Sequence, residues 1–208
     1  MKLYFTPGAC SFSPHIVLRE LGLPFDLVKV DLATKKLADG SDFKSVHPKA
    51  YVPILQLDDG RTITEGPAII QYLADLKPEK KLAPANGTFE RTQLQEWLNF
   101  ISTELHKSFS PLFHADAIGE KAVEFFKAKL NLRLGDIVEP VLSKNDYLTG
   151  SQFTVADVYL YVMLTWAKSF KFDFSAWPGI SRFYDRVSER PAVIATREAE
   201  AQAKKKAA

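Results

Sequence analysis

The sequence predicts two folding units in one chain, a small α/β domain followed by an all-helical domain. Over the first 80 residues, short apolar runs typical of strands alternate with helical segments. The stretch from Lys77 to Thr88 holds two prolines, an Asn-Gly pair and several charges, which is typical of a linker. Beyond it, apolar residues recur with the helical period only. We therefore expect domains at 1–80 and 88–208, joined by a linker at 81–87.

The first domain begins with a strand, a helix and a strand. Lys2–Phe5 is a short apolar strand. A helix runs from Ser11 to about Leu21 and stops at Gly22, because glycine readily adopts the conformation that ends helices. Phe25–Val30 then alternates apolar and polar residues, as a half-buried strand does.

The same domain continues with a candidate short helix near Asp42–Val46 and a hairpin. Asp58-Asp59-Gly60 separates two strand-like runs at 52–57 and 61–64, a strong hairpin pattern. Pro67 begins a last helix that reaches Leu76. The order predicts a mixed four-stranded sheet with helices on both faces.

The second domain is predicted to be helical throughout. Long amphipathic helices are expected at 90–109 and 120–142. Thr154-Val155-Ala156-Asp157 fits a capping box, in which the first and last residues satisfy each other's backbone groups at a helix start. Pro178 and Pro191 each begin another helix.

Composition limits the classes of function. The net charge of +2 gives no general attraction to nucleic acid or to membranes, and no segment resembles a signal peptide or a bilayer span. One cysteine excludes an intrachain disulfide and a multi-cysteine zinc site, and four scattered histidines do not suggest a metal site. We expect a cytoplasmic protein without a metal or a prosthetic group.

Cys10 is the candidate for chemistry in the first domain. It follows a strand and a turn and precedes a helix, where unpaired N–H groups and the helix dipole favour a thiolate. The thiolate is the nucleophilic form of cysteine. The alternative is a small buried residue, the usual fate of an unpaired cysteine.

Two further segments suit a zwitterionic ligand. Val52-Pro53 precedes a strand, where a cis proline would turn backbone groups toward a ligand, although an ordinary strand-start proline fits too. Glu65-Gly66 begins a helix whose N–H groups bind anions, while the carboxylate can bind an ammonium group. The alternative for Glu65 is a plain helix cap.

Together, these segments resemble the glutathione S-transferase superfamily, and finer details resemble its bacterial beta class. The similarity covers essentially the whole chain. The segments that carry the beta-class resemblance are Thr6–Ser11, Ser13–His15, Thr34–Lys36, Trp97–Phe100, Glu104–Lys107 and Ser110–Phe113.

The resemblance implies a thioredoxin-like first domain, a homodimer, and glutathione as co-substrate. Cys10 would lie beside the glutathione sulfur, and Lys35 would reach the glycine carboxylate. Val52, beside a cis Pro53, would pair its backbone with the cysteinyl part, and Glu65 with Gly66 would hold the γ-glutamyl end. Tyr4 and Ser11 remain alternatives for holding the glutathione thiolate, as hydroxyls do in other classes.

The first long helix of the second domain carries further candidates. Asn99, Thr103 and His106 recur at helical spacing on one polar face, which in the absence of a ligand simply faces water. The resemblance implies that Asn99 and Glu104 reach glutathione across a dimer interface. His106 could hydrogen-bond Cys10, stabilising a thiolate or passing protons.

An apolar pocket for a second substrate is expected from the helical domain. Its candidates are Phe109, Phe113 and Trp166, for which core packing is the alternative. The predicted function is conjugation of glutathione to small hydrophobic electrophiles, as in detoxification, with thiol transfer or dehalogenation through Cys10 as a variant. A non-catalytic protein that binds glutathione or hydrophobic ligands is the alternative.

Overall fold

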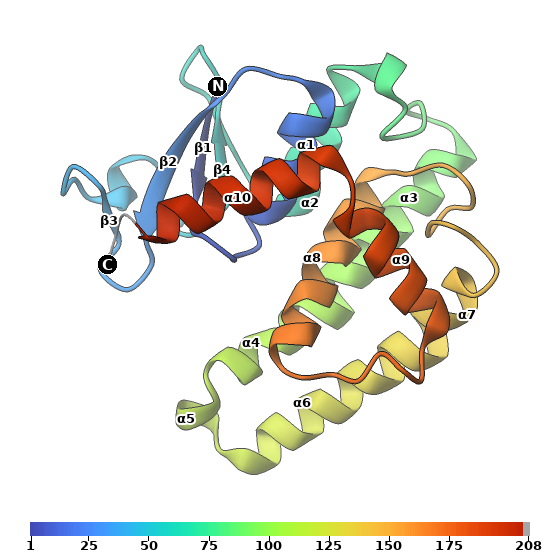
Figure 1. The fold of residues 1–208 in the computed structure, drawn as a ribbon. Helices are drawn as coiled ribbons and strands as arrows, with labels where there is room; N and C mark the ends of the chain where they lie inside the picture. Colours follow the sequence, from blue (N-terminus) through green and yellow to red (C-terminus); the bar gives the residue numbers. More distant parts are fainter. Residues whose placement is uncertain (206–208) are drawn as a thin grey trace. The chain divides into compact units, whose positions relative to one another are not determined.

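The structure, a computed structural model, describes residues 1–205, so the last three residues of the predicted domain 88–208 lie outside the described part. The chain forms two compact units (Figure 1). The first unit comprises Met1–Lys80 together with the segment from Glu189 onward, and the second comprises Lys81–Ser188. No helix within residues 1–205 is both long and apolar enough to cross a membrane.

The first unit is built on a mixed sheet in the order β3-β2-β1-β4-β5. Strands β1 (Lys2–Phe5) and β2 (Asp26–Asp31) are parallel, whereas β4 (Ile54–Gln56) is antiparallel to β1 and to β5 (Thr62–Thr64). These four strands and the hairpin between β4 and β5 are those that the sequence predicts.

A fifth strand corrects the prediction of four. The two-residue strand β3 (Lys36–Leu37) pairs antiparallel with the end of β2, through Val30 opposite Leu37. The side chain of Asp31 accepts hydrogen bonds from the N–H groups of Ala33 and Thr34, which turns the chain back along β2. A strand of two residues is too short to show a sequence period.

Helices cover one face of this sheet, whereas the other face, also predicted to carry helices, is covered by a largely irregular segment with one short 3-10 turn. Helix α1 (Phe12–Leu21) packs against α2 (Gly66–Asp75), and α1 ends at Gly22 in the left-handed conformation as predicted. On the other face the helix η1 (Phe43–Ser45) is one 3-10 turn. The apolar core there consists of Tyr4, Val30, Phe43, Ala50, Val52 and Ile54.

The last helix, α10 (Pro191–Lys205), packs on α1 and belongs to the first unit by its contacts. Arg190 donates two hydrogen bonds to Glu20 at the end of α1, at 2.6 and 2.9 Å. Near its other end, the carboxylate of Glu200 contacts His15 on α1 at 3.0 Å. The predicted domain 88–208 includes α10, so the structure differs there, because chain order does not reveal this packing.

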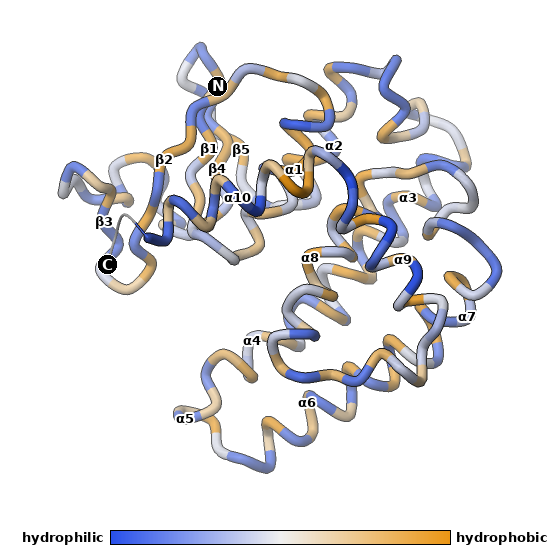
Figure 2. The backbone as a smooth tube through the Cα atoms, viewed as in Figure 1, coloured by the Kyte–Doolittle hydropathy of each residue, from blue (hydrophilic) through white to orange (hydrophobic). Residues whose placement is uncertain are grey.

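The second unit is helical, and within residues 81–188 the only β pairing is an isolated bridge between Tyr147 and Gly150. Figure 2 shows hydrophilic and hydrophobic residues alternating along α6 (Glu120–Arg133). The elements are α3 (Phe89–Phe100), η3 (Ile101–His106), α4 (Lys107–Phe113), α5 (Ala115–Ile118), α6 (Glu120–Arg133), η4 (Leu134–Val138), α7 (Glu139–Leu142), α8 (Val155–Ser169) and α9 (Pro178–Ser188).

Each of the two predicted long helices contains a π-helical segment that the sequence did not predict. Within the helix expected at 90–109, η3 has π geometry, and η4 interrupts the helix expected at 120–142 in the same way. A π segment winds wider than an α-helix, so it shifts the faces on which later side chains lie. A regular 3.6-residue period does not anticipate such a segment.

Helix α8 is the buried centre of the second unit. Its capping box forms as predicted, with the side chain of Asp157 accepting 2.8 Å hydrogen bonds from the backbone and the hydroxyl of Thr154. The other carboxylate oxygen accepts a hydrogen bond from the N–H of Leu148. Burial raises the pKa of Asp157 to about 6.

Candidate active site

Cys10 lies in the turn that joins β1 to α1. The N–H of Ala9 bonds the carbonyl of Thr6, and Gly8 has a φ of 77°, which glycine adopts without a steric penalty. The Cys10 side chain is half-buried, and its Sγ donates to the carbonyl of Val52 at 3.4 Å. A thiolate cannot donate, so this contact belongs to the neutral thiol.

Three chain segments meet beside this thiol. Val52 is joined to Pro53 by a cis peptide bond at the start of β4. A Cβ placed on Gly66, at the start of α2, would lie 3.9 Å from Ser13 Oγ and 4.0 Å from Pro53 Cγ. The structure thus brings together Cys10, Val52, Pro53 and Gly66, which come from separate motifs of the sequence.

Glu65, next to this cluster, is held in a constrained state. Its φ of 68° and ψ of 112° are unusual for a non-glycine residue, a conformation that costs about 1–3 kcal/mol and often occurs at functional sites. Its side chain makes no cap to helix α2. It is instead an ion-pair partner of Lys49 at 3.0 Å and accepts a short hydrogen bond from the Tyr51 hydroxyl. The plain-cap alternative therefore does not describe this side chain.

Lys49 and Tyr51 are partners of Glu65 that the sequence did not predict. The hydrogen bond from Tyr51 to Glu65 raises the pKa of the tyrosine, and contacts with Tyr51 and then Glu65 raise the pKa of Lys49. Lys49 Nζ also donates to Thr64 Oγ1 at 3.0 Å. In the sequence, only their positions shortly before Val52 indicate these two residues, because no motif includes them.

Lys35 lies in the turn between β2 and β3, with a φ of 57°. Its carbonyl accepts a 2.9 Å hydrogen bond from the N–H of Phe43, which fixes the backbone of this turn. The assignment of the Lys35 side chain to the glycine carboxylate stays a prediction.

The two hydroxyls considered as alternatives to Cys10 have structural partners. Ser11 is fully buried, and its Oγ accepts from the N–H of Thr6 and donates to the Thr6 carbonyl, both at 3.2 Å. Tyr4 is 5% exposed and donates to Gln56 at 3.1 Å, while burial raises its pKa. Both arrangements favour a role in holding the turn and the sheet.

In the second unit, the π-helical segment η3 carries or adjoins all the polar candidates. Thr103 Oγ1 donates to the carbonyl of Asn99, and both residues are exposed. Glu104 accepts a 2.7 Å hydrogen bond from Arg133 and lies 3.4 Å from Lys129, both on α6. The Arg133 contact, followed by that of Lys129, lowers the pKa of Glu104. The Glu104 carboxylate thus has cationic partners within its own unit.

His106 ends η3 and joins an aromatic cluster. Its Nδ1 lies 2.5 Å from the hydroxyl of Tyr159, and its ring packs edge-on against Trp166. Phe109 and Phe113 also contact Trp166, with ring centroids 5.8 and 5.1 Å away. We call His106, Phe109, Phe113, Tyr159, Trp166, Phe170 and Phe172 the aromatic cluster.

The cluster brings together the three residues predicted for an electrophile pocket. Phe109 and Trp166 are buried, which agrees with the core-packing alternative, whereas Phe113 is 52% exposed. An aromatic ring that is half open to solvent at the edge of a packed cluster is suited to contact an apolar ligand. Tyr159, Phe170 and Phe172 were missed because their spacing in sequence does not reveal which face they share.

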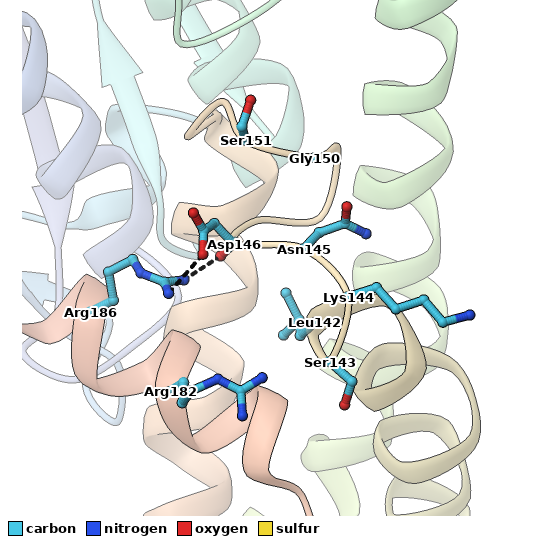
Figure 3. Close-up of a pocket in the computed structure, with 9 residues that line it drawn as sticks. All are labelled: Leu142, Ser143, Lys144, Asn145, Asp146, Gly150, Ser151, Arg182 and Arg186. Atoms are coloured by element: carbon cyan, nitrogen blue, oxygen red, sulfur yellow. Dashed lines mark hydrogen bonds and ion pairs between the residues drawn. The ribbon is translucent and has the colours of Figure 1, made fainter.

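Cavities in the described part of the chain lie away from these candidate residues. In the first unit, one of about 860 Å³ is lined by Thr6, Pro7 and Lys29 among others, and another of about 520 Å³ lies between α1 and the start of α10. A third, of about 290 Å³, lies between the end of α7 and α9, where Arg182 faces Ser143 and Arg186 bonds Asp146 (Figure 3). None of these three is lined by Cys10, Glu65 or His106.

The chain is similar to known proteins over both of its units. The family model for the glutathione S-transferase N-terminal domain matches residues 8–76, and that for the C-terminal domain matches residues 100–191. Glutathione S-transferase GstA of Escherichia coli O157:H7 is 45% identical over 193 residues, covering 93% of this chain and 95% of that protein.

Solved structures show the same similarity. A ternary complex of BphK, a bacterial glutathione S-transferase, is 57% identical with a TM-score of 0.94, covering 97% of this chain and 100% of that one. A sphingomonad glutathione S-transferase complexed with glutathione is 44% identical with a TM-score of 0.92, and the match covers 97% of this chain and 99% of that one. The beta class enzyme of Sphingomonas chungbukensis is 46% identical with a TM-score of 0.90, covering 96% and 98%.

A thioredoxin-like domain with a thiol at the β1–α1 turn, followed by a helical domain, defines a glutathione transferase fold, and the chain belongs to the glutathione S-transferase family. The bacterial beta class is the part of the family that it resembles. The predicted family and fold class are thereby confirmed, apart from the strand number corrected above.

Proposed function

We propose that the chain catalyses the addition of reduced glutathione to small hydrophobic electrophiles. The observation that carries the proposal is the convergence of Cys10, the cis Val52-Pro53 bond and the Glu65-Gly66 helix start in the first unit. This arrangement offers a tripeptide an exposed backbone segment, a helix N-terminus and a carboxylate. The glutathione complex of the sphingomonad relative supports the same ligand.

Each residue of the first unit then has a separate task. Val52 pairs its backbone with the cysteinyl part of glutathione, beside Pro53. Glu65 exchanges Lys49 for the γ-glutamyl ammonium group, and Gly66 lets the ligand approach the backbone. Lys35 binds the glycine carboxylate, and Cys10 lies beside the reacting sulfur.

The second unit supplies the groups that act on the sulfur and on the electrophile. His106 stabilises the glutathione thiolate, and Phe113, with Phe109 and Trp166 behind it, contacts an apolar electrophile. Asn99, Thr103 and Glu104 form the polar surface of η3 and its approach, where the family resemblance implies contacts with glutathione of a homodimer partner. The ion pairs of Glu104 make Asn99 the better candidate for such a contact.

Thiol transfer is the variant that Cys10 permits. The Cys10 thiolate attacks a glutathione mixed disulfide, forms a new disulfide with glutathione and releases the other thiol. A second glutathione then attacks that disulfide, giving oxidised glutathione and regenerating Cys10. In dehalogenation through Cys10, the glutathione sulfur first displaces halide from carbon. The Cys10 thiolate then attacks the sulfur of that conjugate, the carbon leaving group takes up a proton, and a second glutathione regenerates Cys10 as above. A chain with a single cysteine, which forms no intrachain disulfide, suits a reducing, cytoplasmic location and a role in detoxification.

The test uses the full chain on immobilised glutathione, followed by a product screen with glutathione, a panel of electrophiles and mixed disulfides. We expect retention, elution by free glutathione and mass-identified conjugates. Retention without turnover of any compound would favour a protein that binds glutathione or hydrophobic ligands without catalysis.

A further inference from the structure

The contact between His106 and Tyr159 is the best-defined feature of the aromatic cluster. Tyr159 is 1% exposed on α8, and its hydroxyl lies 2.5 Å from His106 Nδ1. A hydroxyl buried this deeply needs hydrogen-bonding partners, so the contact forms part of the packed interior of the second unit. Helix α8 is largely buried, which makes it a rigid support.

The imidazole ring is fixed by packing as well as by this hydrogen bond. The His106 ring is edge-on to Tyr159, with centroids 5.8 Å apart and an angle of 82°. It is also edge-on to Trp166, at 5.0 Å and 70°. These ring contacts and the hydrogen bond together restrict both the tilt and the flip of the imidazole.

We propose that Tyr159 is a positioning residue that holds His106 in the tautomer with its proton on Nε2. A phenol at neutral pH carries its proton and donates readily, so Nδ1 accepts from Tyr159 and Nε2 carries the imidazole proton. In histidines generally, the hydrogen bond made by one ring nitrogen determines whether the other ring nitrogen carries the proton.

This tautomer selects between the two roles that the sequence leaves open for His106, and the choice rests on the proposed function. With its proton on Nε2, neutral His106 donates a hydrogen bond to a thiolate and stabilises it. It does not act as the base that removes the thiol proton, because that role needs an unprotonated Nε2. Tyr159 thus makes His106 a hydrogen-bond donor to the glutathione sulfur.

The direct test is nitrogen NMR of histidine-labelled full chain, with His106 assigned by the His106→Ala variant. We expect a pyridine-like Nδ1 and a protonated Nε2 in the unsubstituted protein, and an average of tautomers in Tyr159→Phe. Tyr161→Phe is the matched control, since Tyr161 is equally buried on α8 but packs on Tyr184. A proton on Nδ1, or a tautomer indifferent to Tyr159→Phe, would overturn the proposal.

Kinetics test the consequence for the reaction. With chlorodinitrobenzene and saturating glutathione, Tyr159→Phe should lower kcat roughly tenfold, part of what a positioned proton donor contributes, while the glutathione Kd stays within about twofold. In the His106→Ala background the same change should have no further effect. An additive loss would show that Tyr159 acts apart from His106.

The two proposals fail in different ways. An unsubstituted protein that binds glutathione but conjugates nothing overturns the proposed function, and the NMR comparison still decides the tautomer. Normal conjugation with unaltered kcat in Tyr159→Phe overturns the positioning role alone.

Discussion

At the scale of single residues, Glu65 shows how the free protein prepares a binding group. Its carboxylate is already engaged by Lys49 and by Tyr51, and its backbone is held at a positive φ. An exposed ion pair contributes little to stability, because water screens it. A ligand ammonium in a drier site can therefore replace Lys49 at small cost.

We predict that Glu65→Gln weakens glutathione binding by about tenfold or more, because a charge-assisted hydrogen bond contributes about 1.5–3 kcal/mol. Calorimetric titration measures the dissociation constant, and thermal unfolding should change little. Glu79→Gln is the control, an exposed glutamate in the same unit. Equal affinities in Glu65→Gln and the unsubstituted chain would remove Glu65 from the site.

Cys10 gives a second prediction at this scale. If glutathione lies beside its thiol, reduced glutathione should slow alkylation of Cys10 by iodoacetamide, read by mass spectrometry. Oxidised glutathione should add a single tripeptide mass, because the chain has one cysteine. Alkylation at the same rate under saturating glutathione would place the ligand elsewhere.

At the scale of elements, two features of the second unit bear on function and stability. The π-helical turn η3 ends at His106, and such turns are frequent at functional sites. Helix α8 begins at a capping box whose acidic member, Asp157, is fully buried and has a pKa raised to about 6. The first feature positions a candidate group, and the second links the stability of the helix to pH.

The Asp157 carboxyl should make stability fall with rising pH. Between its ordinary pKa near 4 and the folded value near 6, the folded chain holds a proton that the unfolded chain has lost. This contribution to the unfolding free energy therefore decreases across that window and is constant above it.

Chemical denaturation at pH 4 and pH 7 measures this effect against Asp157→Asn, which lacks the titration. We expect the variant to be less stable by about 1–2 kcal/mol, because an NH2 group replaces one of the two oxygens that accept hydrogen bonds, and the advantage of the unsubstituted chain to be larger at pH 4. If the advantage instead grows toward pH 7, the three hydrogen bonds to the carboxylate affect the pKa of Asp157 more than its burial does.

At the scale of the whole molecule, the two proposed chemistries use Cys10 differently. In disulfide exchange Cys10 is the attacking sulfur, whereas in conjugation the glutathione sulfur attacks and Cys10 is a neighbour. The contact of Cys10 with the Val52 carbonyl, which belongs to the neutral thiol, is consistent with a neighbour's role.

We therefore predict that Cys10→Ala abolishes thiol transfer but keeps a substantial part of conjugation. His106→Ala should lower the kcat of conjugation more than it weakens glutathione binding, because it acts on the reacting sulfur. Both activities and the dissociation constant are measured on both variants. A complete loss of conjugation in Cys10→Ala, with binding intact, would make Cys10 essential to both reactions.

The sequence by itself determined the elements whose signals are local. The Asp58–Gly60 hairpin, the stop at Gly22, the Thr154–Asp157 capping box and the helix starts at Pro178 and Pro191 all form as predicted. Turn, cap and proline preferences act over a few residues, so a sequence displays them directly.

Only the tertiary structure decided which residues far apart in sequence are in contact. In the folded chain, Glu65 contacts Lys49 and Tyr51, and Tyr159 contacts His106. Glu104 forms an ion pair with Arg133 on α6, and α10 packs within the first unit. The π-helical turns changed the faces on which side chains lie, which no regular period anticipates. Contacts between residues far apart in sequence depend on how helices and strands pack, and local patterns carry no record of that packing.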